Sequence, residues 1–135
     1  MKVQGQCHCG AIRYEAEVQP GSMRICHCLD CQVMSGSAFR TNIAAPAETF
    51  RLLQGQPRHY VKTADSGAQR VTGFCEQCGT QLYATDPGTP KRYSLRVGTL
   101  AQRDQLGSPQ VQIWTRRRVV WMPPVDGVGE VEGQP

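Results

Sequence analysis

Cys26-His27-Cys28-Leu29-Asp30-Cys31 is the stretch that decides how this 135-residue chain is organised. It places three cysteines close together, and no fourth cysteine lies near them in the sequence. Zinc in proteins is usually bound by four ligands in a tetrahedron, and a catalytic site keeps one position free for water or substrate. The cluster therefore predicts an open metal site with three protein ligands.

The other four cysteines form two pairs. Alternate side chains of an extended backbone share a face, so we expect Cys7 and Cys9 to present both sulfurs to one side. Cys75-Glu76-Gln77-Cys78-Gly79 has the Cys-x-x-Cys spacing of a metal-binding turn, and the glycine permits the conformation of that turn. The two pairs together predict a closed, four-sulfur site that joins the start of the chain to a distant turn.

Seven cysteines also allow other interpretations. Their odd number, their short clusters and the lack of a secretory signal favour metal binding over disulfides. Iron–sulfur clusters also use cysteine thiolates, and a colourless preparation would exclude them. A rival division of the zinc ligands joins Cys26 and Cys28 to the late pair and leaves Cys7, Cys9 and Cys31 as the open set.

A histidine could close the open site, and the candidates are His8, His27 and His59. His27 sits between two cysteines and would point away from them on an extended backbone. We expect His59, in a strand, to be a surface or half-buried residue. Asp30 is the one acid inside the cluster; proton transfer is open to it, but capping or turning the loop is the expected role.

Composition and periodicity predict one mainly β domain over residues 1–122 and a flexible tail over 123–135. The 14 glycines and 9 prolines favour turns and strands over long helices. Apolar and polar side chains alternate over residues 12–18, 39–43, 93–97 and 111–114, as in half-buried strands. We also expect a hairpin of strands 50–53 and 58–62, a turn at Asp65-Ser66-Gly67, and a strand that runs toward Cys75. The tail holds Pro-Pro, glycines and acids, and offers nothing to bury.

The apolar runs are far shorter than the roughly 20 residues that a membrane helix needs, and no signal-peptide core is present. We therefore expect a cytoplasmic protein. The net charge is +4, and the last thirteen residues contain three acids and no Lys or Arg. The rest of the chain is basic enough to attract an anionic small molecule or nucleic acid. Arg116-Arg117-Arg118 is the strongest basic run, but consecutive residues of a strand face opposite sides and form no single patch.

The charge of an open three-cysteine site indicates its chemistry. Zinc with three thiolates sums to −1, so it is a weak Lewis acid compared with a three-histidine site at +2. Activation of water is therefore disfavoured. A soft site of this kind can take an incoming thiol as its fourth ligand and hold it as the nucleophilic thiolate.

Four motifs resemble the glutathione-dependent formaldehyde-activating enzyme family, which also includes centromere protein V. They are Cys7-His-Cys-Gly, Cys26-His-Cys-x-x-Cys followed by Ser35-Gly36 and Phe39, Phe74-Cys-x-x-Cys-Gly-Thr80, and Val97-Gly-Thr-Leu100. The resemblance covers residues 5 to about 122 and implies antiparallel sheets pinned by zinc, sometimes called a β-tent. One motif departs from the family: its late His-Ile-Trp, followed shortly by Ser-Lys, is Gln112-Ile113-Trp114 followed by arginines here.

The resemblance implies two zinc ions per chain. It assigns a structural ion to Cys7, Cys9, Cys75 and Cys78, and a catalytic ion to Cys26, Cys28 and Cys31. The implied activity is that of a carbon–sulfur lyase, which condenses formaldehyde with glutathione to S-hydroxymethylglutathione and catalyses the reverse reaction.

We therefore expect a small thiol and a small aldehyde as substrates, with the thiol bound at the zinc of Cys26, Cys28 and Cys31. Ser35 and Phe39 are candidates to line the substrate pocket, and Trp114 is a further one. Neither a membrane nor nucleic acid is an expected partner. The alternative is a non-catalytic zinc module that binds nucleic acid or protein through its basic surface.

Overall fold

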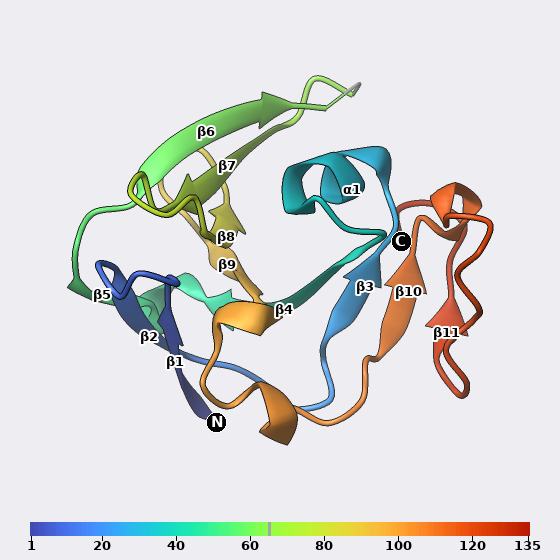
Figure 1. Cartoon of the computed structure of the whole chain (residues 1–135), viewed down its shortest axis with the longest axis horizontal. Coiled ribbons are helices and arrows are strands. Elements are labelled where there is room, and N and C mark those ends of the chain that lie inside the picture. Colours follow the sequence, from blue (N-terminus) through green and yellow to red (C-terminus); the bar gives the residue numbers. More distant parts are fainter. Residues whose placement is uncertain (65) are drawn as a thin grey trace.

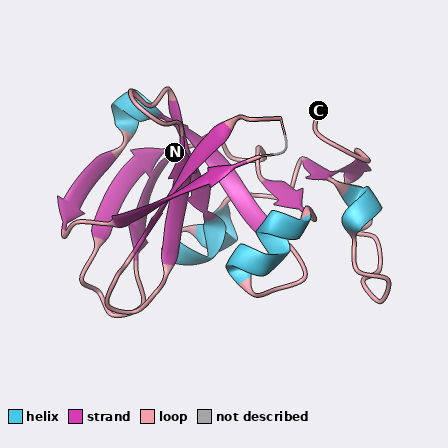
Figure 2. Ribbon diagram, turned by 90° about the horizontal axis from the view of Figure 1, so that it is seen from above, coloured by secondary structure: helices cyan, strands magenta, loops and turns pink. Residues whose placement is uncertain are grey.

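The computed structural model describes residues 1–64 and 66–135, which form one mainly β domain (Figure 1). The strands are β1 (Lys2–Gln6), β2 (Arg13–Glu17), β3 (Arg24–Cys26), β4 (Arg40–Pro46), β5 (Arg51–Gln54), β6 (Arg58–Thr63), β7 (Gln69–Phe74), β8 (Gln81–Thr85), β9 (Arg92–Arg96), β10 (Val111–Ile113) and β11 (Gly129–Glu130). The helical elements are α1 (Leu29–Ser35) and the 3-10 turns η1 (Ala47–Thr49), η2 (Val97–Thr99), η3 (Arg103–Gln105) and η4 (Thr115–Arg117). Figure 2 shows these helical turns, in cyan, around the strands.

The described strands pair into two sheets. The smaller sheet has the order β1-β2-β5, and the larger has the order β11-β10-β3-β4-β9-β8-β7-β6. In the larger sheet β10 runs parallel to β3 and β11, whereas the other pairings are antiparallel. Figure 1 shows α1 between the β6–β7 hairpin and β3, so one face of the large sheet is covered by this short helix.

Two hydrophobic cores of unequal size hold the elements together. The main core takes the inward-facing side chains of both sheets, among them Tyr14, Ile43 and Leu95, which are at most 1% exposed. A second, smaller core gathers Cys26, Cys31 and Ile113, with partly buried side chains around them. The three-cysteine stretch of residues 26–31 therefore belongs to a core that is separate from the main one.

The periodic segments are strands in the structure. The predicted strands at residues 12–18, 39–43, 93–97 and 111–114 correspond to β2, β4, β9 and β10, and β7 ends at Phe74 next to Cys75. The prediction of a mainly β, antiparallel-rich single domain is confirmed. No helix of the described residues is long and apolar enough to cross a membrane.

The predicted hairpin of residues 50–62 is wrong. β5 pairs with β2 in the small sheet, whereas β6 pairs with β7 in the large one. Gly55, between them, has a φ of +78°, and a Cβ there would clash with the carbonyl of Ala11. Only glycine fits this close approach to Ala11. The loop can therefore pack against the residues that precede β2 before the chain crosses to the large sheet.

The turn predicted at Asp65-Ser66-Gly67 lies partly outside the described residues, since Asp65 is not among them. On either side of it, the amide of Ala64 donates to the carbonyl of Ala68 at 2.8 Å, and β6 pairs antiparallel with β7.

The expectation that the tail has nothing to bury is also wrong. β11 pairs in parallel with β10, and Val131 packs against the small core. The amide of Val131 donates to the carbonyl of Gln112 at 2.8 Å, and Arg118 forms an ion pair with Glu130 at 2.7 Å. The tail is thus attached to the rest of the domain by backbone hydrogen bonds, one ion pair and one apolar side chain.

We predict that Gly5→Ala destabilises the fold. A Cβ at Gly5 would overlap the ring of Tyr14, which is fully buried in the main core. Overpacking of this kind costs about 1–3 kcal/mol in the free energy of unfolding. Urea denaturation measures the loss, with Gly98→Ala as the control because nothing lies within 4 Å of its Cβ position. Equal midpoints for the two variants would contradict the packing described.

Attachment of the tail predicts a second difference. Val131→Asp places a carboxylate against the small core and should lower the free energy of unfolding by about 1–3 kcal/mol. Val120→Asp is the matched control, since Val120 is 101% exposed, and it should change stability by no more than about 0.5 kcal/mol. If both variants unfold at the same urea concentration, the tail does not contribute to the folded state.

Candidate metal centre

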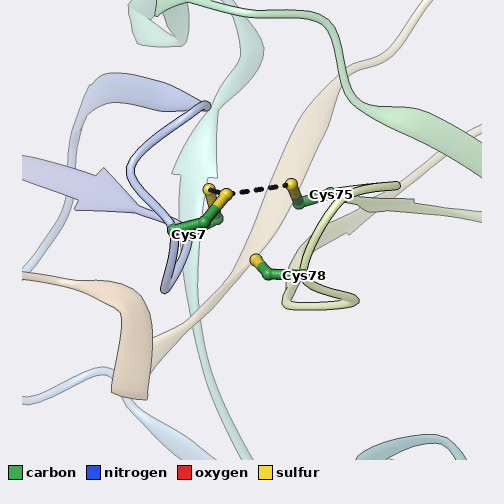
Figure 3. Close-up of side chains that lie close together, drawn as sticks. Cys7, Cys75 and Cys78 are labelled. Carbon is green, nitrogen blue, oxygen red and sulfur yellow. Dashed lines mark hydrogen bonds between the residues drawn. The ribbon is translucent and has the colours of Figure 1, made fainter.

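Four sulfurs from two distant turns meet beside the main core. The Sγ atoms of Cys7, Cys9, Cys75 and Cys78 lie within 4.8 Å of one another. Figure 3 shows Cys7 facing Cys75 and Cys78 across the gap between the turns. The Cys7–Cys9 and Cys9–Cys75 sulfur distances are both 3.7 Å. A tetrahedral zinc with Zn–S bonds of about 2.3 Å separates its sulfurs by about 3.8 Å, so the donor set fits a zinc ion.

The first turn differs from the extended backbone predicted for Cys7 and Cys9. Because Gln6 pairs with Arg13 across β1 and β2, the chain must reverse direction between them. The amide of Gly10 donates to the carbonyl of Cys7 at 3.1 Å, and Gly10 has a φ of 80°. A tight turn, rather than alternation along a strand, thus brings the two sulfurs together.

The second turn follows the prediction from its glycine. The amide of Gly79 donates to the carbonyl of Cys75 at 2.7 Å, and Gly79 has a φ of 77°. The Thr80 hydroxyl lies 3.2 Å from the sulfur of Cys78 and lowers the pKa of Cys78 to about 5. The same hydroxyl accepts a hydrogen bond from the amide of His8 at 3.1 Å. Thr80 therefore links the two turns and favours the thiolate, the form that binds a metal.

A second group of three sulfurs lies at the start of α1. Cys26 ends β3, Cys28 is the N-cap residue of the helix, and Cys31 lies in its first turn. The amide of Cys31 donates to the sulfur of Cys28 at 3.3 Å, and the three Sγ atoms lie within 4.8 Å of one another. No His, Asp or Glu of the described residues joins this group. The structure thus divides the sulfurs four plus three, rather than by the rival pairing of Cys26 and Cys28 with the late turn.

Hydrogen bonds among the three sulfurs favour a thiolate at one of them, Cys28. Hydrogen bonds from the thiols of Cys26 and Cys31 lower the pKa of Cys28, whereas Cys28, Cys31 and burial raise the pKa of Cys26, and the pKa of Cys31 is raised as well. Arg40 donates from Nη2 to the sulfur of Cys31 at 3.1 Å. Three soft donors with a cation beside them can hold zinc and leave one of its four positions free.

The histidines are engaged elsewhere. His27 is fully buried, and its Nε2 lies 2.9 Å from Oε1 of Gln112. His59 Nε2 lies 3.0 Å from the hydroxyl of Tyr83. His8 and these two are absent from both sulfur groups. Asp30 does not cap the helix as expected, because the sulfur of Cys28 takes that position; Asp30 instead pairs with Lys62 of β6 at 2.7 Å.

The predicted pocket residues lie at the far end of α1 and beyond it. Ser35 is exposed, and its hydroxyl has only local partners, donating to Gln32 at 3.4 Å and accepting from Ser37 at 3.2 Å. The ring of Phe39 lies 5.9 Å from that of His27. Trp114 packs against the small core that contains Cys26 and Cys31.

Sequence reasoning missed two arginines near the sulfurs, Arg40 and Arg96. Both were expected on the polar faces of their strands, and yet Arg96 is only 6% exposed. A period-two pattern gives the face on which a residue lies, but it does not tell whether α1 and the β6–β7 hairpin cover that face.

The arginine run after Trp114 lies in η4 and just after it, not on a strand as expected. Arg116 lies over the ring of Trp114 at 5.5 Å and donates to the carbonyl of Glu132 at 2.9 Å. Arg118 pairs with Glu130. Two of the three arginines are therefore occupied by contacts within the chain.

The chain is 27% identical over 96 residues to a Halomonas elongata protein named "Putative glutathione-dependent formaldehyde-activating enzyme", a match over 67% of this chain and 60% of that protein. It is 32% identical over 81 residues to an uncharacterised lyase of Schizosaccharomyces pombe, over 59% of this chain and 55% of the relative. The chain thus spans less than two thirds of the length of these relatives.

A crystal structure of a Rhodobacter sphaeroides protein has the same fold, with a TM-score of 0.57 and 20% identity over 95% of this chain and 98% of that one. The sequence pattern of one family, described as glutathione-dependent formaldehyde-activating enzyme, matches residues 2–117. The seven cysteines all lie within that match, and the chain therefore belongs to the glutathione-dependent formaldehyde-activating enzyme family.

Proposed function

We propose that this protein is a zinc-dependent enzyme of the carbon–sulfur lyase type, which adds a thiol such as glutathione to formaldehyde or another small aldehyde. The observation that supports this most directly is the group of three sulfurs without a fourth donor among the described residues. Membership of the family and the printed names of the relatives support a formaldehyde-activating or lyase-type function.

The reaction forms one carbon–sulfur bond. The thiol sulfur attacks the aldehyde carbon, the electron pair of the C=O bond moves to oxygen, and the proton lost by the thiol ends on that oxygen. A zinc ion bound by Cys26, Cys28 and Cys31 would supply a position for the thiol in its nucleophilic thiolate form. Since the addition proceeds without a catalyst, holding the two reactants together is the main gain.

The residues of the chain provide the orientation. Arg40 holds the sulfur of Cys31 through Nη2, and the N-cap bond from Cys31 to Cys28 fixes the first turn of α1. The ion pair of Asp30 and Lys62 ties α1 to β6 and places exchangeable protons beside the cysteine loop. We assign transfer of the proton to this pair, and we retain Ser35 and Phe39 as the outer lining of the substrate site.

The alternative, a non-catalytic zinc module that binds nucleic acid or protein, has less support. Its best feature was the arginine run at residues 116–118, and contacts within the chain already engage Arg116 and Arg118. Phosphate tracking needs several free cations on one face.

The two sulfur groups should respond differently to the loss of one cysteine. The intact protein should bind one zinc ion per sulfur group. Elemental analysis together with the protein concentration gives the number of zinc ions per chain. Cys31→Ala should lose one zinc and keep the fold, because Cys31 lies in the small core and takes no part in the link between the two sheets. Cys78→Ala should unfold the domain, because it opens the link between the two sheets.

Exchange spectroscopy by NMR then measures how fast glutathione and formaldehyde interconvert with their adduct. The intact zinc-loaded protein should accelerate the exchange, and folded Cys31→Ala should not. Collapse of the Cys31→Ala fold would make this site structural, and an unchanged exchange rate in the intact protein would contradict the proposed reaction.

A further inference from the structure

Arg96 is a buried cation with an unused edge. It is 6% exposed, and its Nη1 donates to Oδ1 of Asn42 at 2.7 Å and lies 3.5 Å from the carbonyl of Ser94. Its Nε and Nη2 are buried and have no partner. These two N–H groups point the same way from the planar guanidinium, and together they match the two oxygens of a carboxylate.

Arg40 connects this edge to the three sulfurs. Asn42, the partner of Arg96, lies opposite Arg96 in the β4–β9 pairing, and Arg40 lies two residues earlier on the same face of β4. Arg40 donates from Nη1 to Oε1 of Gln81 at 3.0 Å and from Nη2 to the sulfur of Cys31 at 3.1 Å. The Nε of Arg40 is buried without a partner as well.

Neither arginine has a counterion among the described carboxylates. The acids of neighbouring elements are paired with other cations, Asp30 with Lys62 at 2.7 Å and Asp86 with Arg70 at 2.6 Å. Burial and the nearby charge of Arg40 lower the pKa of Arg96 to about 9. A buried guanidinium without a counterion is unfavourable, so the empty site is short of negative charge.

The charge of a loaded site leaves the free donors as the deciding feature. A divalent ion with three thiolates sums to −1, and a thiol bound as thiolate brings the sum to −2, which Arg40 and Arg96 together offset. The Nε and Nη2 donors of Arg96 still lack an acceptor after this count. A carboxylate on the incoming molecule would supply that acceptor.

We propose that Arg96, supported by Arg40, is the receptor for a carboxylate of the thiol substrate, so that the site selects thiols that bear a carboxylate. This inference rests on the proposed function, because it assumes that the thiol sulfur binds at the three-cysteine site. Both free donors of Arg96 are buried, and the neighbouring side chains must move apart to admit the carboxylate.

Cobalt(II) in place of zinc makes the test spectroscopic, because thiolate binding to cobalt produces near-ultraviolet absorption. Three probes are titrated: glutathione, its diethyl ester, which lacks both carboxylates, and 2-mercaptoethanol, which reports the metal position alone. The intact protein should bind glutathione about tenfold more tightly than the diethyl ester.

Arg96→Gln should reduce this preference to near unity and leave the affinity for 2-mercaptoethanol unchanged. Arg92→Gln is the matched control, since Arg92 lies on the same strand and face but is exposed; it should keep the preference. Arg96→Lys retains the charge without the planar fork and should also lose most of the preference. Metal content and thermal unfolding of each variant show whether it is folded. If Arg96→Gln does not fold, Arg96→Lys carries the test.

The outcomes separate the two claims. If glutathione and its diethyl ester bind the intact protein equally well, or if Arg96→Lys keeps the full preference, the carboxylate receptor is overturned while thiol binding stands. If 2-mercaptoethanol and glutathione both leave the cobalt absorption unchanged, the proposed function fails and the receptor fails with it.

Discussion

Sulfur atoms that approach within 4.8 Å in groups of four and three impose the main constraint on this structure. As thiolates at such distances they repel one another, and a divalent cation converts that repulsion into a cross-link. The group of four joins the β1–β2 turn of the small sheet to the β7–β8 turn of the large sheet, beside the main core. The group of three lies at the start of a short helix, over a small core. The group of four therefore lies where an ion would hold the two sheets together, whereas we propose a chemical role for the group of three.

Local sequence patterns predicted those features that depend on neighbours along the chain. Alternation gave β2, β4, β9 and β10, and the Cys-x-x-Cys-Gly spacing gave the turn at Cys75 and its left-handed glycine. The partners of a strand are a different matter, because alternation does not tell which sheet a strand joins. For that reason β5 and β6 were mistaken for a hairpin, and the Cys7–Cys9 turn for an extended segment. The attachment of the tail was not predicted, because its strand is two residues long and only one of its valines, Val131, packs against the small core.

The departure from the late motif of the family has a structural explanation. Gln112, where the family commonly has histidine, is fully buried. Its Oε1 lies 2.9 Å from Nε2 of His27, the residue between Cys26 and Cys28 in the sequence. Arg118 donates to the same Gln112 oxygen at 3.4 Å and pairs with Glu130 of β11. A chain of polar contacts thus runs from the cysteine loop to the C-terminal strand, and it orients the backbone that holds Cys26 and Cys28. Buried polar groups of this kind were invisible in the sequence, as were the covered arginines of β4 and β9.

Zinc-edge X-ray absorption tests the central claim most directly, since it counts the sulfur neighbours of the bound metal. With one ion in each sulfur group, the account predicts an average of about 3.5 sulfurs and a lighter neighbour at the open position. Addition of glutathione should raise the average to about four sulfurs as the lighter neighbour is replaced. An average that does not change on addition of the thiol would contradict the account, whether or not the metal already had four sulfurs at the start.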